Sequence, residues 1–177
     1  GARVCICERS TCNAFDINPC CRWCTRGDGI FCENKSLRTF SPDAYGGFST
    51  HFKRSCWQLY KVKPALNAFE AANLEPLATS ISVVRKVLGF LSNQPFLANI
   101  AVIGGGLFGN LIVQLLSINK FLNIELFDLD AKRLDLVGFS GAKLTVVEEE
   151  ADFWAKYKDR FAVVLDCSGS SSISDVV

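Results

Sequence analysis

The chain has 177 residues, of which 49% are hydrophobic and 21% charged, and its 19 basic and 18 acidic residues leave a net charge of +1. This balance excludes a disordered charged tail and gives no electrostatic basis for binding nucleic acid or a lipid surface. The sequence contains no Met, no secretory signal and no apolar run of membrane-spanning length. We therefore expect a segment of a longer, soluble, cytoplasmic protein.

Residues 1–63 have the pattern of short strands and turns. Runs at 4–6 and 57–62 are strand-like, and residues 43–47 predict a turn that leads into an extended segment over 48–53. The single histidine of the chain, His51, falls in that segment, and we expect it to be a packed or surface residue rather than a ligand.

Cysteine is concentrated near the N-terminus, where seven of the nine cysteines fall within the first 32 residues. A secreted domain held by disulfides would spread them along the chain, so a local metal site in a reducing compartment fits better. Cys21 and Cys24 have the spacing with which two thiolates bind one tetrahedral zinc ion, and Cys32 follows after seven residues. Either Cys20 or Cys12 supplies the fourth ligand. The alternative interpretation is a loop of free or disulfide-paired cysteines.

Helical signals begin at residue 67 and continue to about residue 91. Asn67 is a candidate N-cap with Glu70 three residues later, which is the spacing of a capping box. Because proline disfavours helix in the residue before it, we expect a break near residues 74–76. Residues 92–95 form a linker.

From residue 99 the pattern alternates between strand and helix. We expect helices over 107–120, 131–137 and 149–157, and strands over 99–103, 123–128, 143–147 and 161–166. Apolar strands that alternate with amphipathic helices predict an α/β fold with a parallel sheet that is covered on both faces.

A glycine-rich turn lies between the first of these strands and its helix. It reads Gly104-Gly105-Gly106-Leu107-Phe108-Gly109. In such a turn the first glycine permits the tight bend, the second lets the backbone approach a pyrophosphate, and the third allows close packing of helix on strand. The context of strand, turn and helix therefore predicts a dinucleotide-binding fold. A flavin or nucleotide-sugar site, or a turn that no longer binds, are the alternatives.

The next strand ends at Asp128, nineteen residues beyond Gly109. A carboxylate at this position accepts hydrogen bonds from ribose hydroxyls and repels a 2′-phosphate. Asp130 adds negative charge nearby. These residues favour NAD over NADP as the cofactor.

Together these parts resemble the zinc-containing medium-chain dehydrogenases, the alcohol and polyol dehydrogenase family. Residues 70–78, Glu-Ala-Ala-Asn-Leu-Glu-Pro-Leu-Ala, are close to a motif of its polyol and threonine dehydrogenase branch, and residues 1–4 and 43–48 are similar to two further family segments. The resemblance covers essentially the whole chain but only the middle half of a typical member. It implies part of a GroES-like, β-rich catalytic domain over 1–94, followed by the first part of a Rossmann-type NAD-binding domain over 95–177.

The family pattern also suggests roles for single residues. Gly104, Gly106 and Gly109 match its phosphate turn, and Asp128 and Arg133 match positions that contact the adenosine ribose. Cys21, Cys24 and Cys32 match three of its four structural-zinc ligands, but the position expected for the first ligand is occupied by Asn18. Glu75 matches a glutamate that is a ligand or a neighbour of the catalytic zinc.

The family's catalytic cysteine and histidine lie upstream of this segment. We therefore expect the segment to belong to a zinc-dependent, NAD-linked dehydrogenase that oxidises a small alcohol, polyol or sugar and is a homo-oligomer at full length. By itself the segment should be inactive. The competing hypothesis is a non-catalytic, truncated relative that binds zinc and a dinucleotide for stability, partner contact or redox sensing.

Overall fold

The computed structural model describes residues 4–6, 12, 18–34, 59–63, 65–91, 97–137, 140–148 and 153–170. The turn and extended segment expected over 43–53, with His51, lie outside these residues, as do residues 1–3. The chain divides into two compact units, residues 1–72 and 73–177. Within the described residues, no helix combines the length and the apolar character that crossing a membrane requires.

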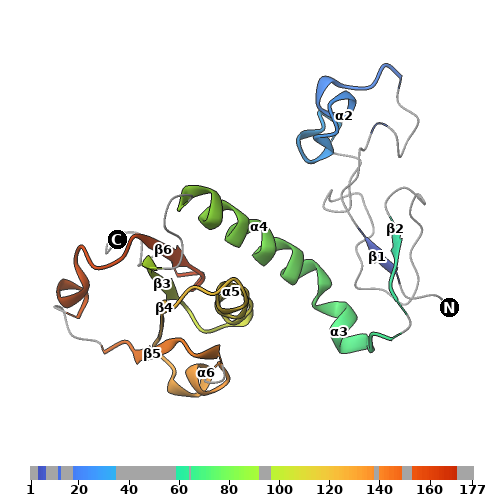
Figure 1. Ribbon diagram of the computed structural model, residues 1–177. Coiled ribbons are helices and arrows are strands. Elements are labelled where there is room, and N and C mark those ends of the chain that lie inside the picture. The colour runs from blue at the N-terminus through green and yellow to red at the C-terminus, as the bar shows by residue number, and fades with distance from the viewer. Residues whose placement is uncertain are drawn as a thin grey trace. The chain divides into compact units, whose positions relative to one another are not determined.

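The first unit contains a small antiparallel sheet and a cysteine-rich loop (Figure 1). Strand β1 (Val4–Ile6) pairs with β2 (Leu59–Lys61). The loop folds into the short helix α2 (Arg22–Thr25) and the 3-10 helix η1 (Gly29–Phe31). The small core of this loop consists of cysteine side chains.

Two consecutive helices follow, α3 (Ala68–Ala72) and α4 (Leu74–Phe90). The capping box predicted for α3 is confirmed: Asn67 Oδ1 accepts from the N–H groups of Phe69 and Glu70, and Glu70 Oε2 accepts from the N–H of Asn67 at 2.7 Å. The break lies at Asn73, just before the predicted position. Pro76 belongs to the first turn of α4, where proline removes no intrahelical hydrogen bond.

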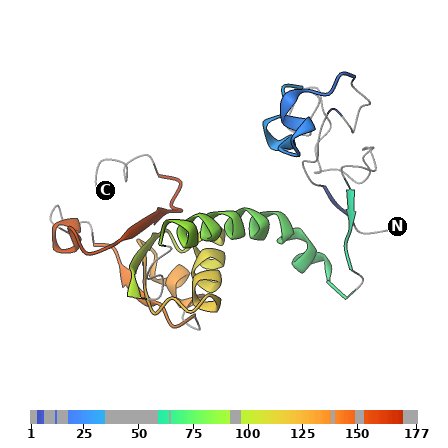
Figure 2. The same ribbon diagram turned by 45° about the horizontal axis from the view of Figure 1, so that its top comes forward.

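The second unit is built on a parallel sheet of four strands in the order β5-β4-β3-β6. Figure 2 shows α4 and α5 beside this sheet. The parallel pairing predicted from the alternating pattern is confirmed. The elements of this unit that follow α4 are β3 (Asn99–Ile103), α5 (Leu107–Ile118), β4 (Asn123–Asp128), α6 (Ala131–Asp135), β5 (Lys143–Val146), η6 (Trp154–Tyr157) and β6 (Val163–Asp166).

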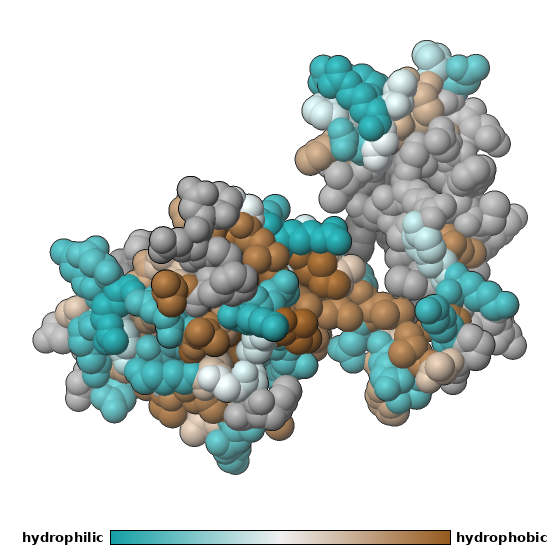
Figure 3. Space-filling model, in the orientation of Figure 1, coloured by the Kyte–Doolittle hydropathy of each residue, from teal (hydrophilic) through white to brown (hydrophobic). Residues whose placement is uncertain are grey.

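The central strands β3 and β4 are buried on both faces of the sheet. Neighbouring residues of each strand point to opposite sides, so each strand contributes to two cores. On one face Val102 and Leu126 pack with residues of α4, α5 and α6. On the other face Phe127 packs with Phe153. In the view of Figure 3, apolar side chains gather over α4 and α5.

The prediction of an α-helix over 149–157 is wrong for the part of this segment that the structure describes. Residues 149–152 lie outside them, and residues 154–157 form the 3-10 helix η6. Phe153 and Tyr157, at its two ends, both pack edge-on against Phe127, with ring centroids 6.4 and 4.9 Å away. These contacts favour a short, tight turn that lays both rings on the sheet.

Candidate cofactor and metal sites

The turn after β3 needs glycine at two positions. Gly104 has a φ of +98°, and a Cβ on it would lie 2.8 Å from the Cα of Ser168, in the loop after β6. A Cβ on Gly109 would overlap the carbonyl oxygen of Gly104. The first glycine therefore permits the bend, and the last lets α5 start directly against β3.

Gly106 differs from these two glycines. A Cβ built on it would have no atom within 4 Å, so the fold itself does not require glycine here. Gly106 is the N-cap of α5, and the exposed residues Leu107 and Phe108 form the start of that twelve-residue helix. The N–H groups at a helix start and the positive end of its dipole attract anions. The open space at Gly106 thus leaves room for a phosphate to approach the backbone.

Asp128 lies beside this turn because β3 and β4 run parallel, with Ile103 paired to Phe127. Its side chain is largely buried, and Oδ2 accepts from the N–H of Gly105 at 2.7 Å while Oδ1 accepts from the N–H of Asp130 at 2.8 Å. Arg133 Nη1 is 3.9 Å from Oδ2, and the Arg133 side chain is mostly exposed. The structure therefore brings Asp128 and Arg133 together at the glycine turn. The hydrogen bond from Gly105 to Asp128 and the close approach of Ser168 to Gly104 were not predicted.

A cavity of about 590 Å³ opens next to the turn, between α5 and α6. It is bounded by the backbone of Gly105 and Gly106 and by the side chains of Asn73, Leu107, Asn110, Leu111, Gln114, Arg133 and Leu136. A cavity of this size accommodates a small organic ligand. Its position supports a ligand that contacts the turn and Arg133 at once.

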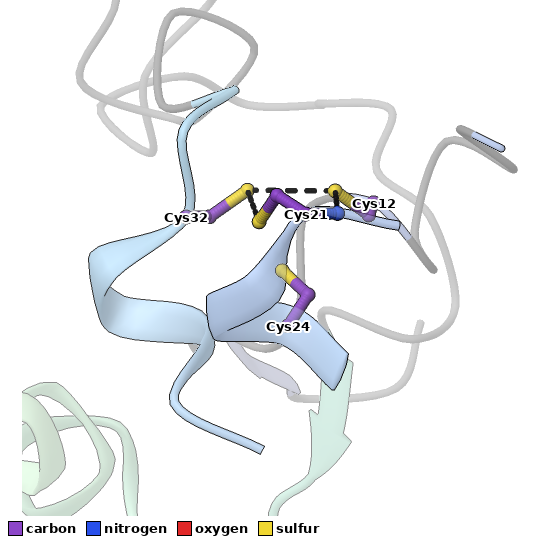
Figure 4. A group of neighbouring side chains, drawn as sticks. All are labelled: Cys12, Cys21, Cys24 and Cys32. Atoms are coloured by element: carbon purple, nitrogen blue, oxygen red, sulfur yellow. Dashed lines mark hydrogen bonds between the residues drawn. The ribbon is translucent and has the colours of Figure 1, made fainter. Parts of the chain in front are cut away.

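Four cysteine side chains of the first unit point toward one another (Figure 4). The sulfur atoms of Cys12, Cys21, Cys24 and Cys32 all lie within 4.8 Å of one another. None of these four cysteines takes part in a disulfide. Cys21, Cys24 and Cys32 meet as their spacing predicted. Of the two candidates for a fourth ligand, Cys12 belongs to this group and Cys20 does not.

The local fold explains how these thiols meet. Cys21 is the N-cap of α2, Cys24 lies in its last turn, and Cys32 follows η1 as its C-cap. Cys12 comes from a separate segment and is completely buried. Cys12 Sγ is 3.8 Å from Cys32 Sγ, and Cys21 Sγ is 3.9 Å from Cys32 Sγ. Four sulfur atoms at about 2.3 Å from a tetrahedral metal ion are about 3.8 Å apart, so these distances fit one metal ion.

The protonation of two of these thiols is shifted in opposite directions. The backbone N–H of Cys24, followed by that of Glu33, lowers the pKa of Cys21 to about 6. The backbone N–H of Cys21 favours the thiolate of Cys12, but burial and hydrogen bonds with the Cys21 and Cys32 thiols outweigh this and raise the pKa of Cys12. Cys21 is thus a thiolate at neutral pH, whereas Cys12 must lose its proton before it can bind a metal.

Glu75 lies in the first turn of α4, far along the chain from the cysteines. Its side chain is exposed, and Oε1 accepts a hydrogen bond from Thr79 Oγ1 at 3.3 Å. Among the described residues, the four cysteines form the one group of three or more potential metal ligands, and Glu75 is not part of it.

The chain is similar to known dehydrogenases. D-arabinitol dehydrogenase 1 from Uromyces fabae is 24% identical over 174 residues, which cover 94% of this chain and 48% of that protein. The alcohol dehydrogenase of the archaeon Aeropyrum pernix matches with a TM-score of 0.74 and 24% identity over 99% of this chain and 50% of its own. A protein assigned as a zinc-binding dehydrogenase from Sinorhizobium meliloti 1021, bound to NADP, matches with a TM-score of 0.75 and 25% identity, over 98% and 49%.

The chain has a medium-chain dehydrogenase fold. The predicted resemblance to the alcohol and polyol dehydrogenases is thereby confirmed, and so is the fold class of a partial GroES-like domain followed by a Rossmann-type parallel sheet. No protein-family model matches the chain. The chain spans about half the length of the medium-chain dehydrogenases that it matches. The predicted domain boundary at residues 94 and 95 stays a prediction.

Proposed function

We propose that the chain is part of a zinc-dependent, NAD-linked alcohol or polyol dehydrogenase, which transfers hydride between a secondary alcohol and NAD. The observation that carries this proposal is the glycine turn. The backbone of Gly106 has open space beside it, and the neighbouring Gly105 donates a hydrogen bond to the Asp128 carboxylate. In this proposal residues 1–94 belong to the catalytic domain and residues 95–177 to the cofactor domain. The dehydrogenases similar to the chain support the reaction class.

The residues of the glycine turn fit a dinucleotide. Gly104 and Gly109 form the turn, and the backbone at Gly106, Leu107 and Phe108 would hold the pyrophosphate. Asp128 would accept hydrogen bonds from the adenosine ribose, and the exposed guanidinium of Arg133 would lie beside it. When bound, the nicotinamide supplies the hydride acceptor.

Two features of Asp128 support NAD rather than NADP. Its carboxylate is largely buried, and the N–H groups of Gly105 and Asp130 hold it in one orientation. A fixed negative charge at the ribose repels a 2′-phosphate. The S. meliloti protein was bound to NADP, and titration of this chain with both cofactors tests its preference for NAD.

The four cysteines fit a structural zinc ion, with Cys12 rather than Cys20 as the fourth ligand. The two sulfur–sulfur distances of 3.8 and 3.9 Å support this assignment, and so does the lowered pKa of Cys21. A closed site of four thiolates stabilises the loop and leaves no open position for a substrate. Because this site needs reduced cysteines, it supports the cytoplasm as the location of the protein.

A catalytic zinc ion does not fit the described residues in the same way. Such a site needs three protein ligands and an open position. Glu75 is the one described residue that the family resemblance assigns to it, and Glu75 is not part of the group of potential metal ligands. We assign Glu75 as a ligand or neighbour of that metal in the whole protein and derive no catalytic step through it. The small alcohol, polyol or sugar substrate and the homo-oligomeric state are likewise proposed for the whole protein.

Cofactor and metal binding test this proposal directly on the chain. Titration with NADH, followed by the change in nicotinamide fluorescence, should give saturable binding that is tighter than binding of NADPH. Elemental analysis should give one zinc per chain. The whole protein should reduce NAD with a panel of secondary alcohols and polyols. Binding without activity in the whole protein would support the non-catalytic relative instead, and absence of NADH binding would overturn both.

A further inference from the structure

Asn34 contacts two of the four clustered thiols. Its backbone N–H donates to Cys32 Sγ at 3.3 Å, and its side-chain Nδ2 donates to Cys12 Sγ at 3.4 Å. Cys12 and Cys32 are twenty residues apart in the chain. Asn34 therefore joins the separate segment that carries Cys12 to the loop that carries the other three cysteines.

The side-chain contact is the informative one. Any residue at position 34 except proline supplies a backbone N–H, but only a residue with a polar side chain can supply a second donor, as the Asn34 amide does. Cys12 also accepts from the backbone N–H of Cys21, at 3.5 Å. Both donors act on Cys12, the completely buried thiol that comes from outside the continuous loop. Because Cys12 is not part of the continuous loop, hydrogen bonds to its sulfur are needed to hold it beside the other three cysteines.

Charge gives a second reason for a donor here. Four thiolates around a divalent metal ion carry a net charge of −2, and N–H donors to sulfur stabilise that charge. Groups that contact metal ligands in this way set ligand orientation, and their loss typically lowers metal affinity 10- to 100-fold. The half-buried side chain of Asn34 is placed to orient Cys12 and to stabilise the negative charge on its sulfur.

We propose that Asn34 is a positioning residue of the metal site, which holds Cys12 as the fourth ligand and offsets the negative charge of its thiolate. The inference rests on the proposed assignment of the cluster as a zinc site. It explains how a cysteine nine residues before Cys21 can complete the ligand set, although the family pattern expects the first ligand at Asn18.

The variant Asn34→Asp tests this role. It keeps the shape of the side chain and the backbone N–H, but it removes the Nδ2 donor and adds a negative charge beside Cys12. Asp28→Asn is the control, because it exchanges the same two side-chain types at an exposed position of the same loop. Zinc affinity is measured by competition with a chromophoric chelator, and the Co²⁺-substituted chains are compared by their thiolate-to-cobalt charge-transfer bands.

We expect Asn34→Asp to weaken zinc binding 10- to 100-fold and to shift the charge-transfer bands, and Asp28→Asn to change affinity less than threefold. A second variant, Asn34→Ala, removes the donor without adding charge and should weaken binding in the same direction. If both Asn34 variants bind zinc like the unaltered chain, with unchanged bands, the role of Asn34 is overturned while the zinc site stands. If the unaltered chain binds no zinc, the zinc assignment fails and this inference fails with it.

Discussion

Asp128 Oδ2 accepts a hydrogen bond from the backbone N–H of Gly105 at 2.7 Å. The carboxylate proposed to bind the adenosine ribose is thus also bonded to the turn proposed to bind the pyrophosphate. The two residues are 23 positions apart, and the parallel pairing of β3 and β4 brings them together. A change at Asp128 should therefore affect the turn as well as the ribose contact.

The variant Asp128→Ala should bind NADH about 10- to 100-fold more weakly. It removes charge-assisted hydrogen bonds, each worth about 1.5–3 kcal/mol, and leaves the Gly105 N–H without this acceptor. Asp128→Asn keeps an acceptor oxygen and removes the negative charge. It should therefore mainly reduce the difference in affinity between NADH and NADPH. Both are measured by fluorescence titration.

Asp135→Asn is the control for these two variants, since it removes one charge from an exposed residue of α6. It should bind both cofactors like the unaltered chain. Equal NADH affinity in Asp128→Ala and in the control would contradict the proposed role of Asp128.

Two glycine variants should separate stability from cofactor binding. Gly109→Ala places a Cβ onto the carbonyl oxygen of Gly104 and should lower the free energy of unfolding by at least about 1–3 kcal/mol. Gly106→Ala meets no atom within 4 Å, so stability should change by less than about 0.5 kcal/mol. NADH binding should nevertheless fall at least about tenfold, because the new Cβ occupies the space of the pyrophosphate.

Thermal unfolding and NADH titration of the same samples test this pair. Gly89→Ala, in α4 with open space around it, is the control and should stabilise the chain by about 0.5–1 kcal/mol. Unchanged NADH affinity in Gly106→Ala would contradict the proposed contact between the pyrophosphate and the backbone at Gly106.

Cysteine alkylation should distinguish Cys21 from Cys167 in the metal-free chain. Burial, followed by the negative charge of Asp166, raises the pKa of Cys167 to about 11, whereas the pKa of Cys21 is about 6. At pH 7.5 Cys21 is mainly thiolate, while on the order of one Cys167 in a thousand is ionised. Timed labelling with iodoacetamide and peptide mass spectrometry should therefore find Cys21 labelled first. Added zinc should slow the labelling of Cys21 and leave that of Cys167 unchanged. Equal labelling rates of Cys21 and Cys167 without zinc would contradict the pKa difference.

Metal retention should depend on pH in a defined direction. Metal binding needs thiolates, so protons compete with the metal as the pH falls through the pKa of Cys21, about 6. The apparent zinc affinity should fall as the pH is lowered, and more steeply below pH 6, as measured by competition with a chromophoric chelator. Because the pKa of Cys12 is raised, zinc binding at pH 7.5 should also release protons, which calorimetry in buffers of different ionisation enthalpy detects. An apparent zinc affinity that is as high at pH 5 as at pH 7.5 would argue against a thiolate site.

Residues close together in the sequence were predicted well, for a local reason. The glycine turn, the Asn67 cap and the alternation of strands and helices depend on backbone conformation and periodicity within a few residues. The helix over 149–157 was not predicted correctly, because the packing of Phe153 and Tyr157 on Phe127 is a long-range contact. Glu125 is a second example: its partner Lys143, with Nζ 2.6 Å from Oε1, lies on the neighbouring strand β5.

The sequence by itself determined the class of the fold, the position of the glycine turn and three of the four clustered cysteines, because glycine geometry and ligand spacing are properties of short segments. The tertiary structure alone decided between Cys12 and Cys20, joined Asp128 to Gly105, and brought Asn34 to two thiols. These contacts join residues up to 23 positions apart, and they form only when separate segments of the same unit pack together.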